Sequence, residues 1–375
     1  MSDNFNGSIA QVNVQFPIET VIQPLAGENY SRALVYIPAS QAENYLPGVS
    51  GAAAGQFVEL NSSNYGELTG GALKNALVPF FTKATTAKVG IAIFADAEGA
   101  GTNLLADVYS ATRMWAYFKL AITTAEANVD TQVTLSNLCL TDPLYSDLWI
   151  GTSDTNVLTS SSSLLIALKE ANSNARVIYN RNAAINPALA QLGASLSVVN
   201  TTGTPVGNSV DMVAFNTIEA SGAADSEGKY QNLSATEKAV LDEQKIGYNT
   251  YIGDGTENVC TEGSLTLKGE SVGANWVKHY IEFVCKVKAA NLITRINKFR
   301  NNATYQAILS LITDQVTPFM AFGRLADLHI TAPVFSELPA SGDAITVPNA
   351  WEATYVDNVR SVTVYGTLYL TQPTR

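Results

Sequence analysis

Apolar and polar residues alternate near both ends of the chain, in SIAQVNVQFPI and in VRSVTVYGTLYLT. Strict alternation is the period of a β-strand with one buried face. The apolar positions are Ala10, Val12, Val14 and Phe16 in the first run, and Val362, Val364, Leu368 and Leu370 in the second. Either these strands pair within the chain's own sheets, or they are arms that add to open sheet edges of neighbouring subunits.

Between residues 26 and 196, short apolar runs alternate with segments of helical spacing. Buried strands are expected in SRALVYIPA, AKVGIAIF and ARVIYN, and helices in LTGGALKNALVPFFTKA and SSSSLLIALKEANSN. A further helix is expected over 103–124, where Leu104, Val108 and Trp115 fall near one face. Strands and helices in alternation predict an α/β domain with a largely parallel sheet.

The segment 197–230 is rich in Gly, Ser and Asn and is predicted to be a linker around one short apolar piece. Beyond it, Ser234 and Glu237 have the spacing of a capping box, which predicts a helix in NLSATEKAVLDEQ. Strands are expected in KIGYNTYIGDG, SLTLKG, DLHITAPVF and AITVPNAWEATYV, and long helices in ANWVKHYIEFVCKVKAANLITRINKFRNN and ATYQAILSLITDQVTPFMAFGRL. These elements predict a mixed α+β domain.

The predicted fold class is therefore α/β, and α+β for the chain as a whole. Its expected parts are an N-terminal strand arm (1–25), an α/β domain (26–196), a linker (197–230), a C-terminal α+β domain (231–358) and a C-terminal strand arm (359–375).

Composition changes this picture by pointing to protein partners. The 375-residue chain is 46% apolar but only 15% charged, below the roughly 25% of an ordinary soluble protein. Much of its surface is therefore expected to meet other protein. A net charge of −11 argues against nucleic-acid binding, and no apolar run is long enough for a membrane span.

Targeting signals and cysteines indicate the compartment. The alternating run near the N-terminus lacks the basic and continuous apolar regions of a signal peptide. The three cysteines are widely spaced, which predicts a reducing compartment without a disulfide framework.

Candidate catalytic and metal-binding residues are few. His279 and His329 are the only histidines, and neither lies beside a plausible nucleophile or a set of metal ligands. In EGAGTNLL, Gly99 and Gly101 precede a predicted helix, but Leu104 stands where a dinucleotide-binding motif needs a third small residue. A tight turn with a helix cap explains the motif more simply. We therefore predict no catalytic residue, no cofactor and no metal site, and a nucleotide-binding enzyme stays the less favoured alternative.

One stretch, residues 276–300, is strongly basic. It carries Lys278, Lys286, Lys288, Arg295, Lys298 and Arg300. With Glu282 as its one acid, its net charge is +5, against −11 for the whole chain. This basic stripe is either a solvated helix face or a surface that steers an acidic partner.

The order of these parts resembles the tail sheath proteins of contractile-tailed bacteriophages. The resemblance rests on SSNYGELTGGALKNALVPFFTKATTAKVGIAIF, SATEKAVLDEQKIGYNTYIGDG, GANWVKHYIEFVCKVKAANLI, LITDQVTPFMAFG and the two end strands. It implies a structural subunit that polymerises helically around the tail tube. The arms, at Ser8–Ile18 and Val359–Thr371, would add strands to a sheet in neighbouring subunits, and the C-terminal domain would face the tube.

The resemblance also implies the partners and the place of the protein. The partners would be other copies of the chain, the tail tube protein, and the baseplate and tail terminator proteins. The subunits would assemble in the host bacterial cytoplasm, lie in the tail of the virion, and contract to drive the tube through the host envelope for genome ejection. The alternatives are a phage-like contractile injection system and another virion structural protein of the tube or capsid. The helices predicted at 103–124, 276–300 and 304–324 argue against a tube protein.

Overall fold

The structure is a computed structural model, and the account below concerns the residues that it describes. These are 32–39, 57–68, 71–85, 87–94, 118–121, 129–141, 147–197, 214–215, 218–251, 259–262, 265–275, 277–278, 281, 302–321, 325–330 and 351–355. Within these ranges no helix is long and apolar enough to cross a membrane.

Nine strands of the described chain form one sheet. In chain order they are β1 (Arg32–Pro38), β2 (Phe57–Asn61), β3 (Lys88–Phe94), β4 (Phe118–Ala121), β5 (Asp147–Thr152), β6 (Arg176–Tyr179), β7 (Ala214–Phe215), β8 (Gly247–Tyr251) and β9 (Val259–Glu262). Their order across the sheet is β2-β3-β1-β4-β5-β6-β8-β9-β7. The pairs from β3 to β8 are parallel, whereas β2, β9 and β7 join antiparallel. The predicted α/β class with a largely parallel sheet is confirmed.

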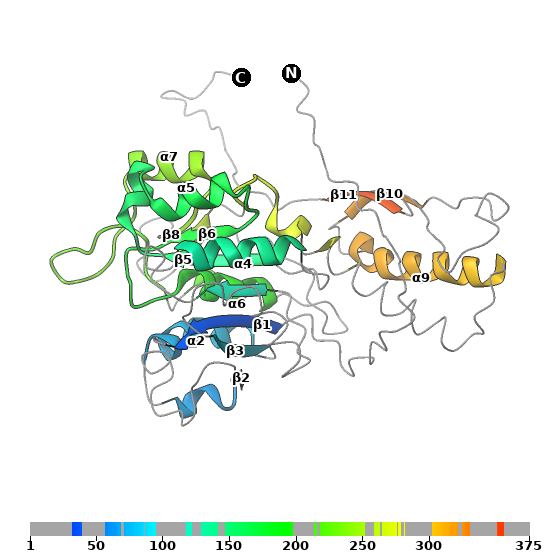
Figure 1. Ribbon diagram of the computed structural model, residues 1–375, viewed down its shortest axis with the longest axis horizontal. Helices are drawn as coiled ribbons and strands as arrows, with labels where there is room; N and C mark the ends of the chain where they lie inside the picture. The colour runs from blue at the N-terminus through cyan, green and yellow to red at the C-terminus, as the bar shows by residue number, and fades with distance from the viewer. Residues whose placement is uncertain are drawn as a thin grey trace, which may run out of the picture.

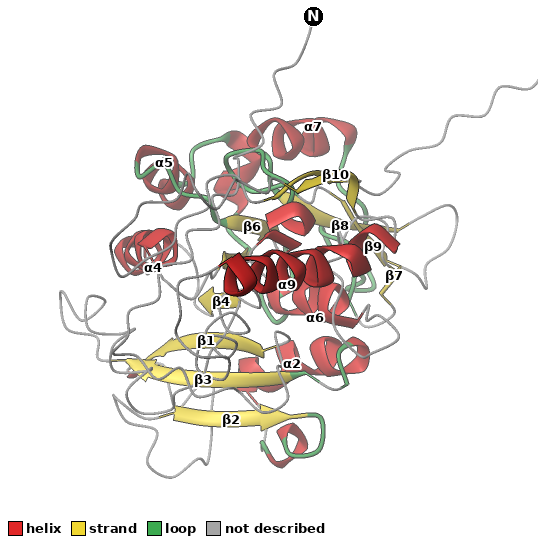
Figure 2. Cartoon of the chain, turned by 90° about the vertical axis from the view of Figure 1, so that its right-hand side faces the viewer, coloured by secondary structure: helices red, strands yellow, loops and turns green. Residues whose placement is uncertain are grey.

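Helices cover both faces of this sheet (Figures 1 and 2). They are α2 (Gly71–Lys83), α4 (Val129–Thr141), α5 (Ser163–Glu170), α6 (Pro187–Ser197) and α7 (Ala235–Gln244). Leu148 and Ile150 of β5 join a buried cluster with side chains of α4, α5 and α7. On the other face, α6 packs on β5 and β6 and also contacts α2. Parallel strands covered on both faces are apolar throughout, which is why Ala33–Ile37 of β1 are all buried.

A second, smaller unit follows in the chain, and Figure 1 shows it at one end of the molecule. It consists of the helix α9 (Asn302–Ala321) and a two-stranded antiparallel sheet of β10 (Leu325–Ile330) and β11 (Trp351–Tyr355). The predicted helix and both predicted strands are confirmed for these residues. In the long helix predicted before α9, the described residues 272–275 and 277–278 are helical.

Two predictions of secondary structure are wrong. The helix predicted over 103–124 does not extend over Phe118–Ala121, which form β4 between β1 and β5. Pairing with two neighbouring strands outweighs the helical spacing there. The strand predicted in SLTLKG is a tight turn closed by a bridge between Leu265 and Ser271, and Gly269 has the positive φ of 83° that such a turn requires.

Several elements were not predicted, namely β2, α4, β5, α6, β7 and β9. In addition, β8 and β9, which follow the predicted linker, belong to the same sheet as β6. Within 197–230 the described residues include Ile218 and Ala220, which are buried. The division of the chain into domains stays a prediction.

Candidate functional site

The sheet of β10 and β11 is the first candidate site, since it lies in the predicted C-terminal domain, shortly before the predicted C-terminal arm. Leu325 lies opposite Tyr355 and Ile330 opposite Trp351, with an irregularity in the register between Ala326 and His329. Asp327 lies within this irregularity and has a φ of 53°. A bulge of this kind bends a strand and increases its local twist.

α9 supports β10 from one side. Leu309, Ile312, Val316 and Phe319 are all buried, and their spacing places them along one face of the helix. α9 contacts β10, whose Leu325 is also buried. In contrast, Asp327 and His329 are exposed, as are Glu352 and Thr354 of β11. The small sheet therefore has an anchor on the helix and a polar, exposed side.

Both edges of this sheet are open among the described residues, because β10 pairs there with β11 alone. An isolated two-stranded sheet is marginally stable in water. Its outer backbone N–H and C=O groups form a template on which a further strand can pair. This geometry makes the small sheet a candidate acceptor for added strands.

Most of the site residues predicted from the sequence lie outside the residues that the structure describes. All eight apolar arm positions, Ala10, Val12, Val14, Phe16, Val362, Val364, Leu368 and Leu370, lie outside the described residues. So do five members of the basic stripe, Lys286, Lys288, Arg295, Lys298 and Arg300. Lys278 is described: it is half-buried on a helical segment, next to the buried Val277. Gly99, Gly101 and His279 also lie outside, and His329 lies on β10 as predicted.

A second candidate lies at the carboxyl end of β6, where open α/β sheets commonly bind ligands. The Arg181 Nε donates to the Tyr179 hydroxyl at 3.1 Å, and the Arg181 Nη2 pairs with Glu237 Oε1 at 2.9 Å. Burial, the largest cause, raises the pKa of Tyr179 although Arg181 acts in the opposite direction. Glu237 accepts a hydrogen bond from the Ser234 N–H at 2.9 Å, which is the main reason why its pKa is lowered.

This cluster joins elements of the fold to one another. Glu237 Oε2 accepts from the Ser234 N–H and hydroxyl, while the Ser234 hydroxyl accepts from the Glu237 N–H at 3.3 Å, so that the predicted capping box of α7 is confirmed. The remaining carboxylate oxygen of Glu237 holds Arg181. Because the ion pair between Arg181 and Glu237 joins the end of β6 to the start of α7, we assign the cluster to fixing α7 against the end of β6 rather than to chemistry. No group of three or more His, Cys, Asp or Glu in the described ranges could hold a metal ion.

Comparisons with known proteins bear on the small sheet and the fold around it. No family model and no curated protein matches the sequence. By structure, the chain is similar to a chain of the anti-feeding prophage (AFP) helical sheath in the contracted state, with a TM-score of 0.63, 11% identity and 98% of each chain covered. The predicted likeness to sheath proteins is confirmed for the fold. A chain of the AFP baseplate is also similar, with a TM-score of 0.61, 11% identity, and 92% of this chain and 94% of that chain covered.

The coverage of these matches matters because it includes both the nine-stranded sheet and the smaller unit. Sequence reasoning identified the strands of β10 and β11 but not that they pair with each other. A short hairpin turn has a recognisable sequence that predicts which strands pair. Here 20 residues lie between Ile330 and Trp351, so no such turn indicates that β10 pairs with β11.

Proposed function

We propose that this chain is the sheath subunit of a contractile tail or injection machine. It polymerises helically around a tail tube and is held together by strands that pass between subunits. The observation that carries the proposal is a two-stranded sheet whose edges are open among the described residues, on a fold shared with a helical sheath. The chain also has two strongly alternating segments, which lie outside the described residues.

The alternating segments fit this sheet as added strands. An edge as long as the six-residue β10 offers outward backbone groups at every second residue, enough for roughly four to six hydrogen bonds with an arm. At about 1 kcal/mol net for each bond, one arm contributes several kcal/mol, and burial of its apolar face adds to this. Repeated in every subunit, such links form a continuous mesh, as a non-closing helical assembly requires.

The mesh explains how subunits can rearrange without separating. During contraction each subunit would rotate as a rigid body, while the added strands stay paired and the segments beside them bend. Pro17, Pro24 and Gly27 after the first arm, and Asp357–Asn358 before the last strand, are the proposed bending points. The extended form would be trapped kinetically above the more stable contracted form.

The remaining partners follow from this role. We propose that the basic stripe, with Lys278 as its described member, faces an acidic surface of the tail tube protein in the extended state. The baseplate would start contraction, and a tail terminator protein would close the far end. A phage tail that ejects a genome is the preferred setting, with assembly in the host bacterial cytoplasm, and a phage-like injection system is the alternative.

A subunit of the baseplate is the second candidate function, because the fold is also similar to a chain of the AFP baseplate. The two functions differ in self-assembly. A sheath subunit forms long helical polymers from one kind of chain, whereas a baseplate subunit stops at a ring or needs other proteins.

Negative-stain electron microscopy of the purified protein tests the proposal. The full chain should form hollow striated cylinders, and a chain lacking Val359–Arg375 should form none. A matched pair of variants places the test on one strand: Val364→Asp, on the apolar face, should abolish the cylinders, and Thr363→Asp, on the polar face, should retain them. Folded monomers from every variant and from the full chain would contradict the sheath function. Closed rings from the full chain would favour the baseplate.

A further inference from the structure

β2 is an edge strand of the large sheet, because β3 is its one neighbour among the described residues. In a strand, the backbone groups of every second residue point away from the paired neighbour. The Glu59 C=O and the Asn61 N–H are two such outward groups. An added strand would bond to this pair, which flanks Leu60 along the edge.

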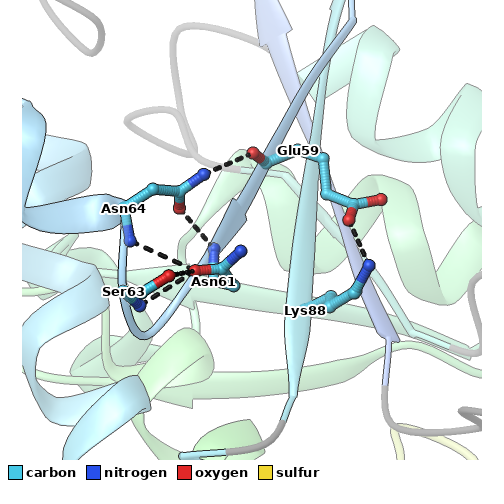
Figure 3. A network of polar contacts seen from close by, with 5 residues as sticks. All are labelled: Glu59, Asn61, Ser63, Asn64 and Lys88. Carbon is cyan, nitrogen blue, oxygen red and sulfur yellow. Dashed lines mark hydrogen bonds and ion pairs between the residues drawn. The ribbon is translucent and has the colours of Figure 1, made fainter.

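A single side chain already occupies both groups. The Asn61 N–H donates to Asn64 Oδ1 at 2.7 Å, and Asn64 Nδ2 donates to the Glu59 C=O at 3.2 Å. A side-chain amide carries one acceptor and a donor, the same groups that one residue of an added strand would present. Figure 3 shows the Asn64 amide beside the strand, bonded to the backbone of β2 at both places.

The turn after β2 holds Asn64 in this position. The Asn61 Oδ1 accepts from the Ser63 N–H at 2.9 Å and from the Asn64 N–H at 3.1 Å, as in an Asx turn. The Asn64 N–H also bonds to the Asn61 C=O at 3.3 Å, so a third outward group of the edge is engaged. In addition, the Glu59 carboxylate forms an ion pair with Lys88 of β3, and charges of this kind also disfavour pairing at an edge.

We propose that Asn64 closes the β2 edge to strand addition, so that a free strand pairs at the β10–β11 sheet and not at the large sheet. Asn64 is thus a specificity-determining residue for assembly. The part that concerns the arms rests on the proposed function. The closure of the edge does not, because it follows from the hydrogen bonds of Asn64 alone.

Hydrogen exchange of the full-length protein, measured with and without a synthetic peptide of residues Val359–Thr371, tests this inference. Asn64→Leu removes the cap. Asn75→Leu makes the same chemical change at an exposed position of α2 and serves as the control. Without peptide, the Asn61 amide should exchange about tenfold faster in Asn64→Leu than in the wild type or in Asn75→Leu, the equivalent of one net hydrogen bond. With peptide, the amides of β2 should become protected in Asn64→Leu alone.

Either of two results would overturn the inference. The first is an exchange rate of the Asn61 amide that is the same in Asn64→Leu as in the wild type. The second is a peptide that protects β2 equally in the wild type and in Asn64→Leu, or that protects it in neither. A second variant, Asn64→Asp, keeps the acceptor for the Asn61 N–H but loses the donor to Glu59, and should also admit the peptide at β2. Failure of the proposed function gives a different result, since the peptide would then leave β10 and β11 unprotected in all the proteins.

Discussion

Adding one methyl group to Gly193 should destabilise the fold, because this glycine lets α6 approach α2. A Cβ at Gly193 would lie 2.7 Å from the Phe80 Cα and 2.7 Å from the Phe80 carbonyl oxygen, whereas ordinary contacts begin at 3.4 Å. Both atoms belong to the backbone of α2 and cannot rotate away. Gly193→Ala therefore requires the helices to separate locally by roughly 0.7 Å, the difference between 3.4 and 2.7 Å.

Two effects of opposite sign decide the magnitude. Alanine in the interior of a helix is favoured over glycine by about 1 kcal/mol. Overpacking of a filled core typically costs about 1–3 kcal/mol, and a clash with backbone falls toward the upper end of that range. We expect a net loss of about 1–2 kcal/mol, which lowers Tm by about 2–4 °C for each kcal/mol in a domain of this size.

The assay is thermal and urea unfolding followed by circular dichroism, with Gly66→Ala as the control. A Cβ at Gly66 meets nothing within 4 Å, so this variant should stay within about 0.5 kcal/mol of the wild type. If Gly193→Ala were as stable as Gly66→Ala, or more stable than the wild type, the close approach of α6 to α2 would not exist in solution.

Three further predictions concern the cap of α7 and the core under β10. Ser234→Ala removes the N-cap hydroxyl and should lower the free energy of unfolding by about 1 kcal/mol, measured in urea, whereas Glu243→Gln on the exposed side of α7 should not. The folded-state pKa of Glu237 is lowered from its ordinary value of 4.5, so its ionised form stabilises the fold above that pH, and this stability is lost as the pH falls through the lower folded-state pKa. Glu237→Gln should therefore flatten the decline of the urea midpoint below about pH 4.5. An unchanged pH profile would contradict this. Ile312→Ala should lower the free energy of unfolding by about 2–5 kcal/mol, because it opens a cavity on the buried face of α9, and it should also reduce assembly. Ser310→Ala, at an exposed position of the same helix, should change neither stability nor assembly. Normal cylinders from a destabilised Ile312→Ala would show that assembly does not need this support.

The sequence predicts the elements whose signal is local. The capping box at Ser234 and Glu237 depends on a spacing of three residues, and the structure contains both of its reciprocal hydrogen bonds. The buried strands β1, β3 and β6 are continuous apolar runs because both faces of a parallel sheet are covered. Such local patterns can be recognised in the sequence without knowing which distant residues they contact.

The features that were missed depend on partners far away in the sequence. Phe118–Ala121 have helical spacing, but the place between β1 and β5 makes them a strand. The pairing of β10 with β11, and the fact that no other described strand lies at the edges of their sheet, depend on the three-dimensional structure. The role of Asn64 could have been suspected from the Asn-Ser-Ser-Asn turn after a strand, but not its contact with the Glu59 carbonyl.

Chemical cross-linking between two separately purified variants tests the central claim that the last strand of one subunit pairs with the small sheet of another. One variant carries Thr363→Cys on the polar face of the arm, and the other carries Thr354→Cys on the exposed side of β11. The unsubstituted chain, treated in the same way, gives the background from the native cysteines. After mixing and assembly, a short bis-maleimide should produce a covalent dimer above background only when both variants are present. The contradicting result has two parts: the mixture gives no covalent dimer, and a single chain that carries both substitutions cross-links only within itself. This result would show that the strand pairs within its own subunit.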